Sequence, residues 1–395
     1  MKLYVPIIWL FYAISIIDAV PVTSNFNSIS LVKNAPQNYS WNEVQQFYNY
    51  YYMLKYESLI QETYGSDQGA LNKFESTKKT LSGSVNLTIS SSSWPGYYGP
   101  VIIGGQKFNV PSVKCDCDGR RKFNESLSKT FKHIGTPFTF YYGQTEVHGV
   151  LGKDQLSVGK IKHVDQIFGL SDDESVFFNE VEFDGMFGMG FGSLSIENVT
   201  TPFSNMVNQK GINPYFGFHF RQLNDTDYVG TLTLGEIDST KLSGSFSYNK
   251  VSKINDTYKY WITKVDGVSI NDHKLKYKQK RAVFDIGYPV IYMPQDDADA
   301  YHKLINGSRF IPSLDIGGVY VVSCNTTDNV EFIFGKNSYS INPLLGPHAF
   351  GDCASSVQPL DIDENTWIFG EALLRDYYSV YNIDNFTIGL APLSK

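Results

Sequence analysis

The sequence has few charged residues, few cysteines and only one long apolar run. Charged residues make up 18% of the 395 positions, below the roughly 25% that is typical of soluble proteins, whereas aromatic residues reach 15%. A chain of this length and composition can bury a sizeable core, so a wholly disordered protein is excluded. The formal net charge of −7 argues against a partner that is a nucleic acid or an anionic membrane.

The motifs of several common enzyme classes are absent. The chain contains no Gly-x-x-x-x-Gly-Lys phosphate loop, no His-Glu-x-x-His metal motif and no Gly-x-Ser-x-Gly nucleophile elbow. The seven histidines are scattered, and a zinc site would need more soft ligands at close spacing. We therefore expect no metal and no other cofactor.

The one long apolar run lies at residues 3–17, between a short basic start and Asp18. This pattern is typical of a secretory signal peptide, which we place at residues 1–19. The alternative is a membrane span, but a span needs about 20 apolar residues, and Pro6 and Asp18 bracket a shorter run. We expect an exported protein without a membrane span, either secreted or in the lumen of an acidic compartment.

Sequons for N-glycosylation are frequent, which fits export. Each Asn-x-Ser/Thr match is weak on its own, but nine of them indicate that several lie on surface loops. The predicted sites are Asn38, Asn86, Asn124, Asn198, Asn224, Asn255, Asn306, Asn325 and Asn385.

The four cysteines are an even number, which in an exported chain indicates two disulfides. A bridge between Cys324 and Cys353 would close a loop of about 30 residues and contribute on the order of 3 kcal/mol. Cys115 and Cys117 are one residue apart, so a bridge between them would be a tight ring with an unfavourable Cα separation. Whether these two cysteines form a bridge or stay reduced is left open.

Residues 20–83 differ in texture from the rest of the chain. They lack the alternation of apolar and polar residues that is typical of strands. A Tyr-rich stretch at 41–64 has its apolar residues at helical spacing. Ser40 is a suitable N-cap for it, with Glu43 three residues later. Two interpretations remain: a helical arm packed on the body of the protein, or a prosegment.

From Ser84 to the end, short runs of Val, Ile, Phe and Tyr alternate with turn residues, which predicts a mostly β protein. The clearest predicted strands are 136–142, 230–235, 282–285 and 318–323. The few predicted helices are 201–209, 295–305 and 372–376.

The segment 282–287 places an Asp-x-Gly, Asp285 to Gly287, directly after an apolar strand, and a second apolar strand follows at 289–294. This arrangement resembles the second active-site loop of the pepsin-like aspartic peptidases. Further segments resemble that family in its own sequence order. They are 110–115, 140–143, 149–152, 154–159, 184–188, 367–370, 374–378 and 388–392.

The resemblance covers about residues 84–395 and implies two β-rich lobes with a peptide-binding cleft between them. We place the lobes at 84–200 and 201–395, after a prosegment-like arm at 20–83. Family prosegments are basic, whereas this arm has five lysines and five acidic residues. The expected ligand is an extended peptide or protein bound by a monomer.

The resemblance also implies roles for individual residues. Tyr142 and Gly143 match the flap that covers bound peptide, although a strand tyrosine among 27 tyrosines can also be purely structural. Gly104 and Gly287 match the glycines of the two active-site loops. Cys324 and Cys353 fall where the family has a disulfide.

Hydrolysis by this family needs two close carboxylates that share one proton. Aligning residues 110–115 with the family puts the first aspartate at Ile102, and a shift of one residue puts it at Ile103. No Asp or Glu occurs anywhere from Ser76 to Cys115. Asp116 and Asp118 follow shortly afterwards, but a solvated turn is the preferred interpretation for them.

The residues that support the carboxylates in the family are also replaced. Ile103 and Ile286 stand where the family has threonines, and Gly105 and Tyr288 stand where it has a serine or threonine. Asp285 is thus the lone surviving catalytic aspartate, and losing one member of such a unit typically costs on the order of 10³- to 10⁶-fold in rate.

Three functions remain open from the sequence. The first is an inactive homologue that binds peptide in the cleft. The second is an active acid endopeptidase with an atypical site built on Asp285. The third is a secreted structural protein whose cleft is vestigial.

Overall fold

The computed structural model describes residues 7–8, 64–65, 81–89, 97–110, 121–142, 145–174, 184–220, 230–277, 279–312, 318–347 and 352–394. Most of the predicted signal peptide and of the predicted helix at 41–64 lies outside these residues. Tyr64, the last residue of that predicted helix, is in a short strand, β2, which pairs with β12.

The described chain is mostly β, as predicted. Strands near the N-terminal and C-terminal ends of the described chain meet in one 12-stranded sheet, within which β5 pairs with β4 and β6 pairs with β7. Its strands are β1 (Ile7–Ile8), β3 (Gly83–Ile89), β4 (Tyr97–Ile103), β5 (Gln106–Val110), β6 (Lys132–Tyr142), β7 (Thr145–Val158), β8 (Ile161–Glu174), β9 (Tyr215–Phe220), β10 (Gly230–Leu234), β11 (Ser247–Lys250), β26 (Tyr377–Asn382) and β27 (Thr387–Pro392).

Three smaller sheets are built from residues 262–369. The five-stranded sheet contains β13 (Ile262–Lys264), β16 (Arg281–Phe284), β25 (Thr366–Phe369), β17 (Ile291–Met293) and β24 (Val357–Pro359). The first four-stranded sheet contains β15 (His273–Lys276), β14 (Gly267–Ile270), β20 (Val330–Phe334) and β21 (Asn337–Ile341). The second contains β18 (Arg309–Ile311), β19 (Val319–Val322), β23 (Cys353–Ser355) and β22 (Leu344–Pro347). The pair β2 (Tyr64–Gly65) and β12 (Lys253–Ile254) stands apart.

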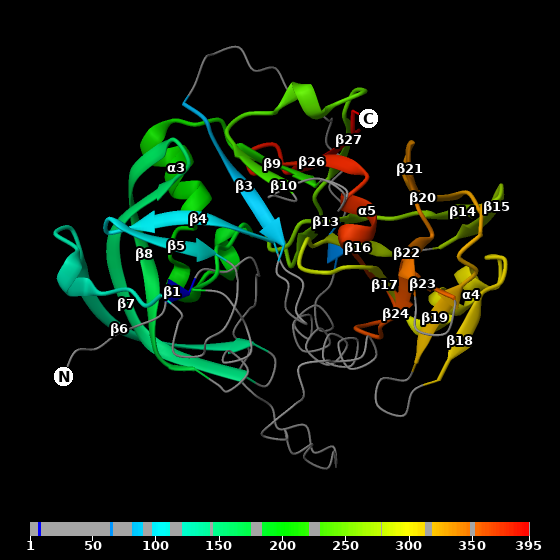
Figure 1. Ribbon diagram of the computed structural model, residues 1–395, viewed down its shortest axis with the longest axis horizontal. Coiled ribbons are helices and arrows are strands. Elements are labelled where there is room, and N and C mark those ends of the chain that lie inside the picture. Colours follow the sequence, from blue (N-terminus) through cyan, green and yellow to red (C-terminus); the bar gives the residue numbers. More distant parts are fainter. Residues whose placement is uncertain are drawn as a thin grey trace.

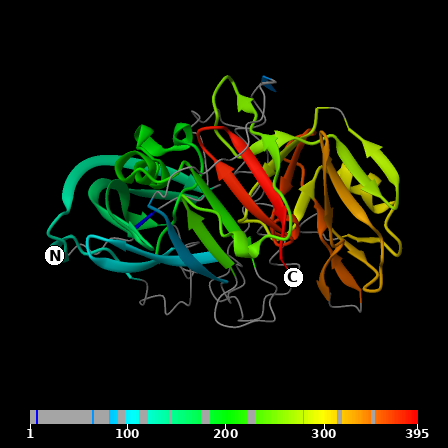
Figure 2. The same cartoon turned by 90° about the horizontal axis from the view of Figure 1, so that it is seen from above.

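Figures 1 and 2 show how these sheets are arranged. Strands β4 to β8 lie on one side of the molecule, and β14 to β24 lie on the other. Strands β9, β10 and β26 lie between the two groups. The described residues thus form two β-rich bodies joined by a central part of the large sheet.

The helices follow their local sequence signals. Helix α3 (Pro202–Lys210) has Thr201 as its N-cap, whose side chain accepts a hydrogen bond from the Ser204 N–H, and Gly211 ends it at φ 64°. Helices α4 (Gln295–His302) and α5 (Glu371–Leu374) are short. The four clearest predicted strands and all three predicted helices are confirmed, with shifted ends.

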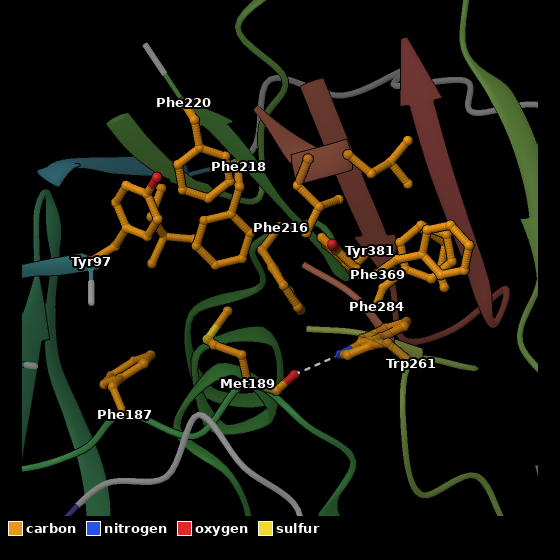
Figure 3. Packing of buried hydrophobic residues seen from close by; sticks show 14 of the residues in the cluster. Tyr97, Phe187, Met189, Phe216, Phe218, Phe220, Trp261, Phe284, Phe369 and Tyr381 are labelled. Atoms are coloured by element: carbon orange, nitrogen blue, oxygen red, sulfur yellow. Dashed lines mark hydrogen bonds between the residues drawn. The ribbon is translucent and has the colours of Figure 1, made fainter. Parts of the chain in front are cut away.

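An aromatic core connects the two bodies (Figure 3). Phe216 of β9 stacks on Tyr381 of β26 at a centroid distance of 5.1 Å, and Trp261 packs edge-on against both rings. The indole N–H of Trp261 donates to the Met189 carbonyl at 2.9 Å. This bond ties the segment that follows β8 to the start of the five-stranded sheet.

The predicted disulfide between Cys324 and Cys353 is present and links the end of β19 to β23. Replacing both cysteines by serine should lower the free energy of unfolding by about 3 kcal/mol, since the bridge closes a loop with a sequence separation of 29. Urea denaturation of the double variant and of the wild type measures this. An unchanged midpoint would contradict it.

Helix α4 ends in a buried histidine. His302 is 3% exposed and donates through Nδ1 to the Ala298 carbonyl at 2.7 Å. Its Nε2 therefore accepts the hydroxyl proton of Ser355 at 2.8 Å. Burial lowers the pKa of His302 to about 3, because the charged ring would be poorly solvated there.

This histidine should make the protein less stable in acid. The unfolded chain protonates His302 below about pH 6.5 but the folded chain does so only near pH 3, so stability should fall by about 1.4 kcal/mol per pH unit in between. The variant His302→Gln should be less stable at neutral pH and should lose less stability on acidification. Urea denaturation across this range tests both, and parallel pH curves for the two proteins would refute the assignment.

Candidate functional site

Asp285 lies directly after the buried strand β16. This strand runs parallel to β25, with Phe284 opposite Phe369, and the Asp285 N–H donates to the Phe369 carbonyl at 3.0 Å. The pairing carries the aspartate to the end of the strand, where its side chain is half-buried. The backbone therefore places Asp285 on a loop after an apolar strand, as the sequence predicts.

The loop turns back on the Asp285 carboxylate. The Gly287 N–H donates to Oδ1 of Asp285 at 2.9 Å, and the Tyr288 N–H donates to the Asp285 carbonyl at 3.3 Å. A backbone donor to a carboxylate fixes its orientation. Gly287 thus contacts the carboxylate through its backbone.

The start of α5 holds the same loop from the other side. The Glu371 N–H donates to the Tyr288 carbonyl at 2.6 Å, and the Ala372 N–H donates to the Pro289 carbonyl at 3.1 Å. A Cβ at Gly370 would lie 2.2 Å from the Tyr288 oxygen and 2.6 Å from the Val290 oxygen. The segment 367–370 was matched to the family by its sequence, and its glycine permits this close approach.

The two residues next to Gly287 have apolar surroundings. Tyr288 is 1% exposed and belongs to a buried cluster with Val283, Val290 and Ile368. Ile286 packs against the main core. Ile286 has no side-chain hydroxyl that could support the carboxylate of Asp285.

The structure does not bring Ile102 to a position equivalent to that of Asp285. Ile102 lies inside β4, opposite Lys107 of β5 and Ser157 of β7, whereas Asp285 follows the end of its strand. Ile103 is fully buried and lies opposite Gln106. The register proposed from the sequence for these two isoleucines therefore disagrees with the strand pairing.

Gly104 and Gly105 form the tight turn between β4 and β5 rather than an active-site loop. Their φ angles are 56° and 79°, which favours glycine at both positions of a two-residue hairpin turn. A Cβ at Gly104 would also meet Oδ2 of Asp154 at 2.2 Å. Gly104 thus has a role in the turn, and its predicted role in ligand binding stays a prediction.

The second body contains a matching hairpin between β14 and β15. Its turn residues Asn271 and Asp272 have φ angles of 48° and 68°. Asp285 follows Asp272 by thirteen positions (285 − 272). In the first body the corresponding segment after β5 is 111–120, which lies outside the described residues together with Asp116, Asp118, Cys115 and Cys117. The absence of a first catalytic aspartate stays a prediction.

The predicted flap is a long hairpin of β6 and β7, with Tyr142 opposite Thr145 at its end. The hairpin buries Phe138, Phe140 and Val147. Gly143 and the side chain of Tyr142 lie outside the described residues, so their contacts with a ligand stay predictions.

Most predicted glycosylation sites are accessible. Asn86, Asn198, Asn255, Asn306, Asn325 and Asn385 are exposed, and Asn124 is partly buried. Asn38 and Asn224 lie outside the described residues. Modification of these sites stays a prediction.

Within the described ranges, no group of three or more His, Cys, Asp or Glu side chains could hold a metal ion. No helix in the same part of the chain is long and apolar enough to cross a bilayer.

Two residues at this site escaped the sequence analysis. Glu371 stands directly after Gly370, and burial raises the pKa of its carboxylate, an effect that the neighbouring Tyr97 of β4 partly offsets. Only the position of Glu371 beside the matched segment 367–370 could have drawn attention to it, because Tyr97 is remote in sequence.

A family model described as eukaryotic aspartyl protease matches residues 95–393. The chain belongs to this family. Cathepsin E of Mus musculus is 32% identical over 328 residues, covering 75% of this chain and 80% of the relative. Embryonic pepsinogen of Gallus gallus is 29% identical over 319 residues, with the same coverage. Cathepsin D of Dictyostelium discoideum is 27% identical over 352 residues, covering 81% of this chain and 89% of the relative. The resemblance to the pepsin-like family is confirmed.

The variant Gly370→Ala should displace the aspartyl protease loop that carries Asp285, because its methyl group would overlap two carbonyl oxygens. We expect a loss of about 2 kcal/mol or more in the free energy of unfolding. The matched control is Gly192→Ala, since nothing lies within 4 Å of a Cβ at Gly192. Urea denaturation measures the free energy of unfolding of both variants. If Gly370→Ala were as stable as Gly192→Ala, the close contact at Gly370 would be refuted.

Proposed function

We propose that this protein is an exported aspartyl protease homologue that binds an extended peptide or protein in the cleft between its lobes without hydrolysing it efficiently. The observation that carries the proposal is the loss of the threonine hydroxyl that the family places beside its aspartate, since Ile286 stands there and packs against the main core. No Asp or Glu occurs from Ser76 to Cys115, so a first carboxylate would have to come from Asp116 or Asp118 in the segment that follows β5.

The chemistry follows from having one carboxylate where the reaction uses two. In a dyad the ionised acid takes a proton from water while the protonated acid polarises the scissile carbonyl. Asp285 alone can accept or donate one hydrogen bond to a peptide, but it cannot perform both tasks at once. We therefore expect binding to survive and hydrolysis to fall by on the order of 10³-fold or more.

The retained framework supports peptide binding. The loop at Asp285, the close contact at Gly370 and the β6–β7 hairpin are all present. We keep lobes at 84–200 and 201–395, preceded by an arm at 20–83, as part of the proposal. A curated relative from Aspergillus fumigatus is named vacuolar protease A, 28% identical over 301 residues. Together with the signal-like start and the exposed sequons, this supports a secreted or lumenal location.

The spacing between the hairpin turn and the following aspartate favours an alternative function, an active acid endopeptidase. Asp118 follows Gly105 by thirteen positions (118 − 105), the same interval that separates Asp285 from Asp272. If Asp118 or Asp116 supplies the first carboxylate, the enzyme would work with an atypical first loop.

Cleavage of unfolded haemoglobin at acid pH separates these functions. The purified exported protein should cleave haemoglobin no faster than the Asp285→Asn variant does. In a calorimetric titration it should bind a statine-type inhibitor, and the Asp285→Asn variant should bind this inhibitor more weakly. The expected reason is the single carboxylate in the cleft. A double variant, Asp116→Asn with Asp118→Asn, serves as the matched control.

Three results would contradict the proposal. Inhibitor-sensitive cleavage that disappears in Asp285→Asn would show an active enzyme. If it also disappears in the double variant, the first carboxylate is in segment 111–120. Absence of both cleavage and inhibitor binding would favour a structural protein with a vestigial cleft.

A further inference from the structure

A chemically labile pair of residues lies between α4 and β18. Asn306 and Gly307 form the only Asn-Gly pair in the sequence. Asn306 is exposed, and Gly307 has a φ angle of 71°. Glycine has no side chain that shields its backbone nitrogen, and its backbone adopts angles closed to other residues. The side-chain amide of Asn306 is therefore open to attack by the nitrogen that follows it.

The buried carboxylate of Asp328 holds Asn306 through both of its oxygens. The Asn306 N–H donates to Oδ2 at 2.8 Å, and Nδ2 of Asn306 donates to Oδ1 at 2.9 Å. Nδ2 of Asn271 also donates to Oδ1, and the Thr326 hydroxyl donates to Oδ2, both at 2.6 Å. Asp328 is 7% exposed, so these four hydrogen bonds replace the water that a charged carboxylate needs.

This carboxylate joins three segments of the second body. Asn271 lies in the β14–β15 turn, Asn306 follows α4, and Thr326 follows β19. Helix α4 and strands β14 and β19 lie on the same side of the molecule in Figure 1. A change of charge at Asn306 therefore acts on a group that all three segments share.

We propose that Asn306 is a site of covalent modification by deamidation, and that its bonds to Asp328 make the stability of the second body depend on this reaction. The Gly307 backbone nitrogen attacks Cγ of Asn306 and forms a new C–N bond. The Cγ–Nδ2 bond breaks, and Nδ2 leaves as ammonia with the proton that the Gly307 nitrogen gives up. Water then opens the succinimide ring and leaves aspartate or isoaspartate at position 306.

The aspartate product removes a hydrogen-bond donor and adds a charge. Its new oxygen would face Oδ1 of Asp328 across the 2.9 Å that the Nδ2 hydrogen bond now spans. Burial would raise the pKa of Asp328, but the four hydrogen bonds hold it below its ordinary value, so Asp328 is charged at neutral pH. Two carboxylates this close repel each other, and neither can donate to the other while both are charged.

The isoaspartate product also lengthens the backbone by one atom. A Cβ at Gly307 would lie 3.0 Å from Cβ of Ser323, so there is little free space beside this part of the chain. Strand β18 begins two residues later at Arg309, which lies opposite Val321 of β19. A longer backbone at 306 would therefore disturb the pairing of β18 with β19.

Asn306 is also the first residue of a predicted glycosylation sequon that ends at Ser308. A sugar on Nδ2 prevents this nitrogen from leaving as ammonia. Deamidation is therefore confined to chains in which the sequon is unoccupied, and the variant Ser308→Ala supplies such chains uniformly. The reaction needs only water and atoms of this chain, so it does not depend on the function of the cleft.

The first test follows the reaction in the full exported chain with Ser308→Ala, held at physiological temperature and neutral pH. Peptide mapping by mass spectrometry should show aspartate and isoaspartate accumulating several-fold faster at position 306 than at position 271. Asn271 is the matched control, because its side chain donates to the same carboxylate but Asp272, and not a glycine, follows it. Equal rates at the two positions, or no conversion at 306, would overturn the proposal.

The second test measures the effect of the product. Asn306→Asp should lower Tm by about 5 °C or more, because it places a second charge beside Asp328. Asn385→Asp is the control, since it adds the same charge and removes a sequon at an exposed position between β26 and β27, and it should leave Tm nearly unchanged. In the Asp328→Asn background, Asn306→Asp should lower Tm no further, because the pair again has one carboxylate and one amide. Equal Tm values for the two aspartate variants, or an undiminished loss in the Asp328→Asn background, would refute the link to Asp328.

Discussion

The contact between Gly370 and the carbonyls of Tyr288 and Val290 is the constraint on which the site depends. It leaves no space for a side chain, so β25 and the start of α5 must lie directly against the loop. The parallel pairing of β16 with β25 then carries Asp285 to the strand end. None of these contacts involves a second carboxylate. The framework that presents Asp285 therefore does not depend on a second carboxylate.

Much of the fold could be predicted because its signals are local. Thr201 and Gly211 cap α3, and the alternation of apolar and turn residues gives the strands. The register of β4 could not be predicted in this way. An apolar run that ends in Gly104 and Gly105 suits either a strand before an active-site loop or one arm of a hairpin. Pairing with β7 and the closeness of Asp154 to Gly104 decide for the hairpin, and both are tertiary contacts.

The residues of the candidate site also differ in whether a local sequence signal predicts them. Asp285 could be found from the sequence because an Asp-x-Gly after a buried strand is a short pattern, and its Gly287 contact follows from the turn. Tyr97 and Glu371 could not be found, since they are neighbours only in the folded chain and neither residue stands in a distinctive motif. A buried polar pair of this kind becomes visible only when the strands are assembled.

The β4–β5 and β14–β15 hairpins show how far along the chain the two bodies have the same strand pairing. Both have a two-residue turn with left-handed residues, and both pair the flanking positions in the same register. The bodies are thus alike up to the end of β5, and any divergence that affects the first carboxylate begins after Val110. Ile102 is held inside β4 by partners on both edges, so a carboxylate introduced there would lie within a paired strand. A second acid for Asp285 would therefore come from the segment that follows β5, where Asp116 and Asp118 stand, rather than from β4.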